Sequence, residues 1–305
     1  MVGGLRRWRR EPQGIRPTAG ERIFDALNTA LLLVLVVVTL YPLYYVLIAS
    51  LSDPKLLEAH TGVLLWPVGF SLEAYQRVWS NPDIRVGYFN TLVYVLGGTA
   101  MNVALTILGA YALSRRNLPG QTPILLAIVF TMFFSAGLIP VYLIVREMGL
   151  LDTRWAVVLP SAISAWNLMI LRTSFLEVPS AYDEAARIDG ASDWALLTRV
   201  YVPMNLAPIA VITLFYAVGH WNSYFDAMIY LSNRDLFPLQ LFLREILVGS
   251  QTDSMSMGTG GADRAPLAAS LKYATIITST LPILLVYPFL QRYFVKGVMV
   301  GGIKE

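Results

Sequence analysis

The sequence predicts an all-α integral membrane protein with six transmembrane helices. Of its 305 residues, 56% are hydrophobic and 14% are charged, whereas a soluble domain carries about 25% charged residues. The deficit is concentrated in six runs without Asp, Glu, Lys or Arg: 26–52, 86–114, 117–145, 155–171, 200–225 and 273–291. A helix needs about 20 apolar residues to cross the hydrocarbon core, so six such runs in one chain argue against a soluble protein.

The first run follows the basic segment Arg6-Arg7-Trp8-Arg9-Arg10, which resembles a twin-arginine export signal. The run is too long for the apolar part of a signal peptide, and no Ala-x-Ala cleavage site follows it. We therefore expect a retained first helix with a basic flank. The second run contains small or short side chains that let helix backbones approach closely: Gly98, Asn102, Gly109 and Ala110.

The fourth run, 155–171, is short for a span. Arg172 can extend it toward Leu176 by reaching to the membrane interface with its long side chain. Prolines in or near the spans are interpreted as kinks that serve packing: Pro42, Pro140, Pro160, Pro208, Pro282 and Pro288.

The distribution of arginine and lysine predicts that both termini are cytoplasmic, because these residues concentrate in cytoplasmic loops. The inside segments are then 1–25, 115–120, 172–204 and 292–305, with Arg115-Arg116 as the clearest marker. The outside segments are 53–85, 146–154 and 232–272. The last combines an amphipathic stretch, Leu239–Leu247, with a Gly/Ser/Thr-rich stretch, 249–261.

The inside segment between the fourth and fifth spans, 177–204, predicts a helix, a turn and a second short helix. Ser180 is expected to cap the first helix, with Asp183 and Glu184 near its positive end. Strong helix formers follow at Ala185 and Ala186.

Gly190 suits the left-handed conformation that ends a helix, and Ser192 can start the next one. A short helix with small residues on one side fits a groove on a partner. The local pattern is equally compatible with a surface helix that only connects two spans.

The order Glu184-Ala185-Ala186, Asp189-Gly190-Ala191-Ser192 and Pro203 resembles the EAA loop of ABC importer permeases. Further segments extend the resemblance over nearly the whole chain: Asn90-Thr91, Tyr111-Ala112-Leu113-Ser114-Arg115, Trp221-Asn222 and Tyr293-Phe294-Val295-Lys296-Gly297. Together they are similar to the maltose-permease-like carbohydrate-uptake branch, and most of all to permeases for oligosaccharides and polysaccharide fragments.

This resemblance implies a type I ABC importer permease of the bacterial inner membrane, in which 177–204 carries a cytoplasmic coupling helix. It assigns ATPase coupling to Glu184, Ala185, Ala186, Asp189 and Gly190. Glu184 would anchor the loop on the ATPase, and Gly190 would supply the bend. The implied partners are a second permease of different sequence, two ATP-binding cassette subunits, an extracytoplasmic solute-binding protein and a sugar. The length and the Gly-rich portion of the outside segment 232–272 predict that it contacts the solute-binding protein. ATP and Mg²⁺ would be bound by the ATPase, and this chain would hold no cofactor.

The fifth span supplies candidate substrate contacts, because sugar sites pair aromatic faces with a few polar anchors. The candidates are Tyr216, His220, Trp221, Asn222 and Tyr224. The alternative is an aromatic belt at the membrane interface, with Asp226 near the outer surface. Asn102 and Asn167 are expected mainly to form hydrogen bonds between helices.

The sequence lacks the residues that several other functions would require. No Gly-x-x-x-x-Gly-Lys-Ser/Thr loop is present, so any ATP must be bound by another chain. The two histidines, His60 and His220, have no metal-ligand spacing, and there is no cysteine and no basic stripe for nucleic acid. We therefore expect neither an enzyme nor a metal site. The alternative transporter, an ion-coupled one, would need a carboxylate at mid-membrane, and the six runs contain none.

The predicted organisation is a cytoplasmic segment at 1–25, a six-helix permease domain at 26–296 and a cytoplasmic tail at 297–305.

Overall fold

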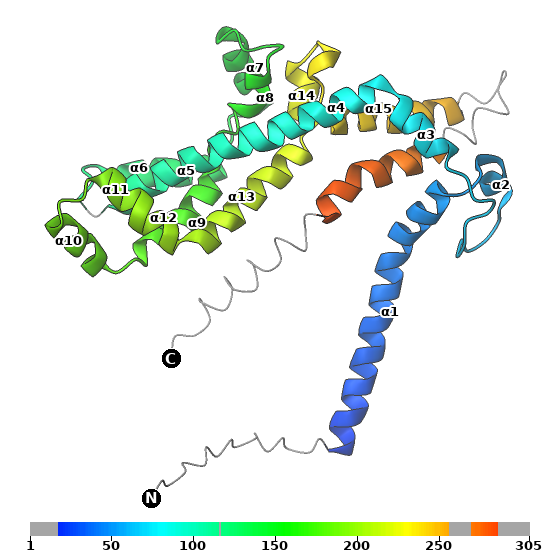
Figure 1. Ribbon diagram of the computed structural model, residues 1–305, viewed down its shortest axis with the longest axis horizontal. Coiled ribbons are helices and arrows are strands. Elements are labelled where there is room, and N and C mark those ends of the chain that lie inside the picture. Colours follow the sequence, from blue (N-terminus) through cyan, green and yellow to red (C-terminus); the bar gives the residue numbers. More distant parts are fainter. Residues whose placement is uncertain (1–17, 116, 256–269, 286–305) are drawn as a thin grey trace, which may run out of the picture.

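The computed structural model describes residues 18–115, 117–255 and 270–285. Within these ranges the chain forms helices and loops, with one isolated bridge between Ser52 and Phe70 (Figure 1). The basic N-terminal segment up to residue 17, the end of the sixth run and the tail 297–305 lie outside the described residues.

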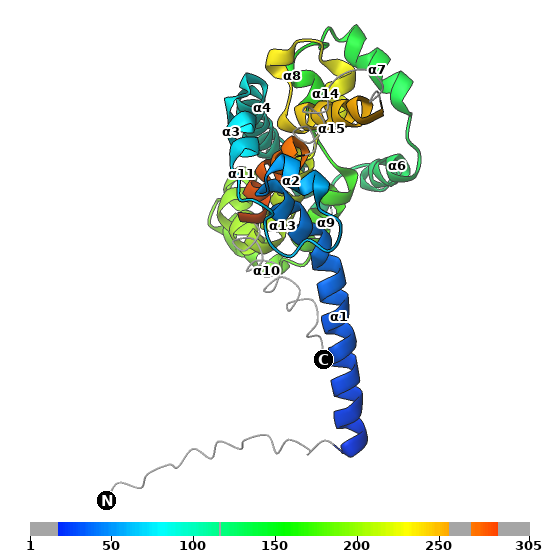
Figure 2. The ribbon, with the colours of Figure 1, turned by 90° about the vertical axis from the view of Figure 1, so that its right-hand side faces the viewer.

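Helix α1, Ala19–Ser50, stands apart from the rest of the molecule (Figures 1 and 2). A capping box begins it: the Thr18 side chain accepts a hydrogen bond from the Glu21 N–H, and the Glu21 carboxylate accepts one from the Thr18 N–H. Apolar side chains along it are exposed, including Val37 and Leu43, each at 66%. A helix this apolar on all sides requires lipid or another protein chain around it.

A second long helix forms the backbone of the body. It runs through α4 (Pro82–Val93), a π turn η1 (Tyr94–Gly98) and α5 (Thr99–Ser114), for 33 residues in all. By length and composition, α1 and this helix can each cross a membrane. The short helices α2 (Pro54–Ala59) and α3 (Glu73–Ser80) precede it.

The third, fourth and fifth predicted spans are bent or interrupted, whereas the described part of the sixth lies in one continuous helix, Ser270–Leu285. Helices α6 (Gln121–Phe133) and α7 (Leu138–Glu147) meet at 116°, and the segment Asp193–Met204 meets α13 (Leu206–Trp221) at 85°. If each bent pair is one span, the described residues contain up to four spans. They confirm an all-α apolar architecture but not the number six. Gly137 with a φ of 83° starts α7, which explains why the third run is not one straight helix.

The fourth run extends past Arg172 to Leu176, as predicted, but it forms two helices. The run is divided into α8 (Arg154–Val158) and α9 (Ala165–Leu176). Pro160 lies in the break, and the Ser164 side chain caps α9 by accepting from the Asn167 N–H. The Arg172 Nε donates to the Leu113 carbonyl near the end of α5 at 2.8 Å.

Residues 232–255 are mostly helical. After α14 (Phe225–Tyr230) and the 3₁₀ turn η3 (Arg234–Leu236), α15 covers Leu239–Met255. Its buried Leu239 and Phe242 pack with Tyr94 in one core cluster. The amphipathic stretch is therefore confirmed, but the Gly/Ser/Thr-rich stretch continues the helix as far as Met255, and its last residues lie outside the described ranges.

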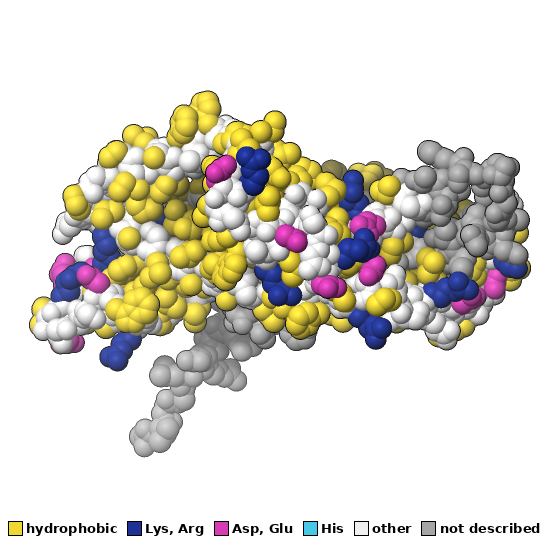
Figure 3. All heavy atoms as spheres, turned by 90° about the horizontal axis from the view of Figure 1, so that it is seen from above, with side chains coloured by type: hydrophobic (Ala, Val, Ile, Leu, Met, Phe, Trp, Pro, Cys, Tyr) yellow, Lys and Arg dark blue, Asp and Glu magenta, His cyan; other side chains and the backbone are white. Residues whose placement is uncertain are grey.

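A second cluster, which includes Ala110, Leu171, Phe175 and Tyr201, joins α5, α9 and the loop that follows α9. Figure 3 shows hydrophobic side chains over much of the left-hand half of one face. Charged side chains lie at its left margin, where α10 is, and in its right-hand half.

Candidate functional site

The loop 177–204 forms the end of the body at which α5 terminates (Figure 1). It contains α10 (Ser180–Ile188), α11 (Asp193–Leu196), the π turn η2 (Leu197–Tyr201) and α12 (Val202–Met204). We call it the coupling loop. Pro179 precedes the first turn of α10 and no side chain caps that end, so the prediction that Ser180 caps it is wrong.

The turn between the two helices has the predicted geometry. Gly190 has a φ of 76°, and the Ala191 N–H donates to the Ala186 carbonyl at 2.9 Å. The Ser192 hydroxyl then caps α11 by accepting from the Ala195 N–H. The sequence therefore sets the bend with one residue free to adopt positive φ and one capping residue.

The outward side of the coupling loop presents the predicted coupling residues. Glu184, Ala185, Asp189 and Gly190 are exposed, and Ala186 is half-buried. Apolar side chains stand among them, with Ile188 85% exposed and Trp194 65% exposed. A hollow of about 500 Å³ runs beside them and is lined in part by Ala186, Asp189, Gly190 and Arg199. Small residues, exposed apolar side chains and an adjoining hollow suit a protein partner.

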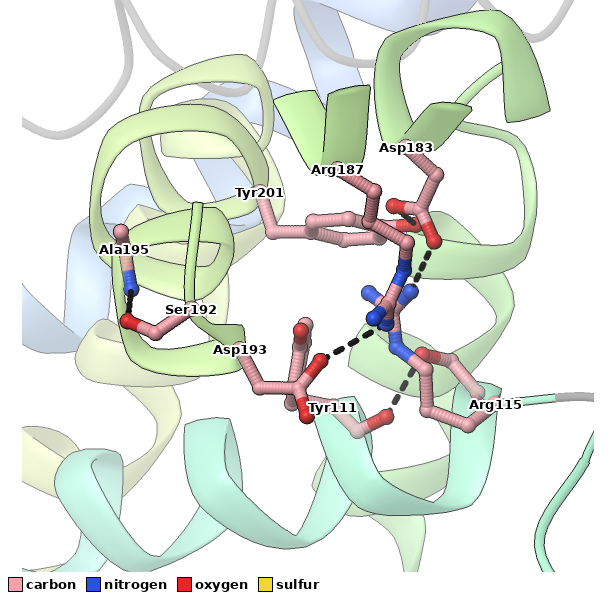
Figure 4. Close-up of polar contacts among 9 residues, drawn as sticks. Tyr111, Arg115, Asp183, Arg187, Ser192, Asp193, Ala195 and Tyr201 are labelled. Carbon is pink, nitrogen blue, oxygen red and sulfur yellow. Dashed lines mark hydrogen bonds and ion pairs between the residues drawn. The ribbon is translucent and has the colours of Figure 1, made fainter. Parts of the chain in front are cut away.

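Four residues on three segments attach this loop to α5 (Figure 4). Arg115, which ends α5, forms an ion pair with Asp183 of α10. Its guanidinium lies over the rings of Tyr111 and Tyr201, 4.1 and 4.4 Å from their centroids. The Tyr201 hydroxyl donates to Asp183 Oδ1 at 2.9 Å. We call these four residues the Arg115 cluster. From the sequence, Arg115 was an orientation marker and part of the family resemblance, and its contact with Asp183 was not predicted.

A cavity of about 610 Å³ lies among α5, α9, α13 and the start of α14. Four of the predicted substrate residues line it, namely Tyr216, His220, Asn222 and Tyr224. The fifth, Trp221, is elsewhere: its Nε1 donates to the Ser279 carbonyl at 3.2 Å inside a core cluster. One helical face of α13 therefore faces the cavity and the other packs in the core.

A buried polar network forms one wall of this cavity. The Tyr216 hydroxyl bonds with Thr106 Oγ1 at 2.7 Å and accepts from the Ser164 N–H at 2.9 Å. Asn102 Nδ2 lies 3.2 Å from His220 Nε2 and donates to the Ser161 carbonyl at 3.3 Å.

Asn102 joins helices, as predicted, but it also lines the cavity. It is 1% exposed, and its Oδ1 has no hydrogen-bond partner among the described residues. A buried acceptor without a partner is costly unless a ligand or water satisfies it. Asn167 and Asp226 also line the cavity. Their residue types alone do not distinguish a role in the cavity from a role in packing, because amides and carboxylates on apolar helices serve both.

Close packing fixes the position of His220. A Cβ atom added to Gly98 would lie 2.6 Å from His220 Nε2, so only glycine leaves room for the ring. Gly98 ends the π turn η1, and such turns are common at functional sites.

The opposite end of the body is held together by charged groups. Arg234 forms ion pairs with Asp83 and Glu245, each at 2.9 Å. The hydrogen bond to Glu245, and to a smaller extent the one to Asp83, raise the pKa of the Arg234 guanidinium. Asp152 accepts from the backbone N–H groups of Asn233 and Ser232, and these bonds lower the pKa of its carboxyl. The segment before α15 is therefore a braced structure. Within the described ranges, no group of three His, Asp or Glu side chains could hold a metal ion.

Residues 116–300 match the family described as binding-protein-dependent transport system inner membrane component. Over 287 residues the chain is 40% identical to the polygalacturonan/rhamnogalacturonan transport system permease protein YtcP of Bacillus subtilis (strain 168), which covers 93% of this chain and 99% of that protein. Protein LplC of the same strain is 36% identical over 94% of this chain and 97% of its own length.

Among solved structures, a chain of a bacterial ABC transporter involved in the import of the acidic polysaccharide alginate is 33% identical. It covers 91% of this chain and 99% of its own, with a TM-score of 0.83. A chain of the alginate transporter in complex with a pentasaccharide-bound periplasmic protein is 14% identical, with a TM-score of 0.52, and shows the fold alone. The chain therefore belongs to the family of inner-membrane components of binding-protein-dependent transport systems, and it is a permease of an ABC importer rather than an enzyme.

Proposed function

We propose that this permease forms one half of the translocation pathway for an oligosaccharide or polysaccharide fragment, and that the cavity beside α13 is its part of that pathway. The observation that carries the proposal is the composition of the cavity wall. Aromatic side chains of Tyr216, Tyr224 and Trp166 stand beside the amides of Asn102 and Asn222. Such a wall offers stacking faces and hydrogen bonds to a ligand rich in hydroxyl groups.

The relatives named for polygalacturonan/rhamnogalacturonan and alginate point to a saccharide with carboxylates. Among the residues that line this cavity there is no Lys or Arg, and Asp226 is acidic. The positive groups that such a saccharide needs would therefore come from the second permease, which we take to be a different chain.

The exposed residues of the coupling loop support a proposed contact with a separate ATPase, which would bind ATP and Mg²⁺. ATP binding would draw the coupling loops of the two permeases together and turn the pathway outward. Glu184, which is exposed and has no ion-pair partner among the described residues, would anchor the loop on the ATPase. We assign the same role to Ala185, Ala186, Asp189 and Gly190.

The test is reconstitution of the complex that co-purifies with this chain. In vesicles with its binding protein, uptake and ATP hydrolysis should rise with trigalacturonate or an alginate trisaccharide and not with amino acids. Uptake that persists without ATP and disappears with an ionophore would instead indicate an ion-coupled transporter. Stimulation by a compound other than a saccharide would also overturn the proposal.

We further propose that the coupling loop is cytoplasmic and that the segment with α7 and α15 faces outside. The chain has no cysteine, so single cysteines report accessibility directly. A membrane-impermeant thiol reagent added outside should label Glu147→Cys and not Ile188→Cys. Both side chains are exposed in the isolated chain, Glu147 at 77% and Ile188 at 85%, so burial within the chain does not bias the comparison, and labelling after permeabilisation with the ATPase removed checks that Ile188→Cys is reactive. Labelling of Ile188→Cys in intact cells would contradict this orientation.

In this orientation α15 and the Arg234 ion pairs lie outside, where the solute-binding protein approaches. We propose that the described part of 232–272 offers this protein a rigid surface. The ion pairs that brace it support this view, because they hold the segment in one arrangement before binding.

A further inference from the structure

We propose that Arg115 is a positioning residue that ties the coupling loop to α5, so that movement of α10 reaches the cavity through α5. This inference rests on the proposed function, in which an ATPase moves α10. Chain connectivity alone links the coupling loop to α9, which precedes it, and to α13, which follows it. The Arg115 cluster adds a third connection to a helix remote in sequence.

The cluster is built for a firm attachment. Asp183 receives two contacts, one from the Arg115 guanidinium and one from the Tyr201 hydroxyl at 2.9 Å. The guanidinium lies against the rings of both Tyr111 and Tyr201, which pack edge to face on each other. A cation over aromatic rings is attracted to them more strongly when it is shielded from water.

The Arg115–Asp183 ion pair is more buried than the other ion pair of the coupling loop, Arg187–Asp193. The Arg115 and Asp183 side chains are 20% and 21% exposed. The Arg187 and Asp193 side chains, which pair at 2.8 Å, are 52% and 67% exposed and join α10 only to α11. Exposed pairs contribute little, whereas removal of one member of a shielded pair leaves a charge without compensation. The two pairs therefore differ both in strength and in what they connect.

Helix α5 reaches directly from the cluster to the cavity. Thr106 and Asn102 lie nine and thirteen residues before Arg115, so the helix spans about 20 Å between cluster and Asn102. Side contacts stiffen it: Gly109 packs on Leu168 of α9, and Arg172 of α9 donates to the Leu113 carbonyl at 2.8 Å. A displacement of Arg115 must therefore move the residues that position Tyr216 and His220.

A distance measurement on the purified complex with its ATPase tests this without a sugar. Spin labels at Leu108→Cys on α5 and Ile188→Cys on α10 report whether the two helices move together; both side chains are exposed. When ATP and vanadate trap the nucleotide, we expect the label distance to stay within about 2 Å in the otherwise unchanged chain. In Arg115→Gln it should change by more than that, and in the control Asp193→Asn it should not.

The proposal would be overturned if the label distance changed by the same amount in the otherwise unchanged chain and in Arg115→Gln. It would also be overturned if the distance changed in neither of them. If Arg115→Gln does not assemble, Tyr201→Phe decides instead, because it keeps the ring and removes only the hydroxyl bond to Asp183. An unchanged label distance in that variant would then also count against the link.

Transport supplies a second readout. With trigalacturonate-loaded binding protein, Arg115→Gln and Asp183→Asn should each lower uptake per ATP hydrolysed by at least about fivefold, while the ATPase stays bound. The double variant should be no worse than either single one, because both remove the same link. Wild-type complex that shows no stimulation by saccharide would count against the proposed function, whereas normal coupling in these variants would count against Arg115 alone.

Discussion

The substitution Gly190→Val is expected to abolish most substrate-stimulated ATP hydrolysis and to lower uptake by about tenfold or more. Gly190 has a φ of 76°, a conformation that costs a β-branched residue about 1–3 kcal/mol, and 1.4 kcal/mol corresponds to about a tenfold change in population. A Cβ atom at this position would have no neighbour within 4 Å in this chain, so no steric clash within the permease adds to the effect of the backbone bend. Uptake and hydrolysis in reconstituted vesicles measure it.

Gly149 provides a matched control. It follows α7 as Gly190 follows α10, with a φ of 67°, and a Cβ atom there also meets nothing within 4 Å. The N–H of the next residue, Leu150, donates back to the Val145 carbonyl at 3.1 Å, as Ala191 does to Ala186. Gly149→Val therefore carries the same strain outside the coupling loop and should leave coupling nearly unchanged. Equal losses in the two variants would show that Gly190 matters only for folding.

The companion variant Glu184→Ala should release the ATPase more readily without altering the loop, since the Glu184 side chain makes no ion pair within the described chain. A charge-assisted hydrogen bond to a partner is about twice as strong as a neutral one. Retention of the ATPase through washing at raised salt is the measurement, and full retention would argue against an anchoring role.

The substitution Gly98→Ala is expected to lower uptake about tenfold while the complex still assembles. The added Cβ would lie 2.6 Å from His220 Nε2, so the imidazole must move away from Asn102. The loss of a buried hydrogen bond costs about 1–3 kcal/mol when one partner is left unsatisfied. The variant thus disturbs the cavity wall without replacing any polar group.

Gly97 is the control for this variant, because it belongs to the same π turn and a Cβ atom there has no neighbour within 4 Å. Gly97→Ala should transport at nearly the original rate. Uptake as a function of saccharide concentration separates weaker binding from slower turnover. If Gly98→Ala transports like Gly97→Ala, the His220–Asn102 contact plays no part in the pathway.

The local features of the coupling loop could be predicted from the sequence, because they depend on single residues. The positive φ of Gly190 and the Ser192 cap follow from backbone preference and side-chain chemistry alone. The Ser180 cap was wrongly predicted because Pro179 can hold the same position without a side-chain hydrogen bond. Asp183 lies in the first turn of α10, as predicted, but its ion pair with Arg115 was not predicted, because the two residues are 68 positions apart and sequence spacing gives no indication of the contact.

The course of the spans could be predicted only in part. Length and charge identified α1 and the α4–α5 helix, since both are continuous. The same criteria could not detect the bends, because glycine, proline and capping serine are also tolerated in straight membrane helices. For α13, composition indicated which residues are candidates, but only packing shows that Trp221 turns away from the cavity that Tyr216 and His220 line.

The π turn η1 also sets the rotational phase of the longest helix of the body. Every fourth residue along that helix is buried, in the series Asn90, Tyr94, Gly98, Asn102, Thr106, Ala110 and Ser114. On a regular α-helix each such step turns the series by about 40°, because four residues exceed one turn of 3.6. A π turn holds one residue more, so the step from Tyr94 to Gly98 does not add to this rotation. Deletion of one residue from the turn would swing Asn102 and Thr106 by about 100° relative to Asn90, away from the cavity wall.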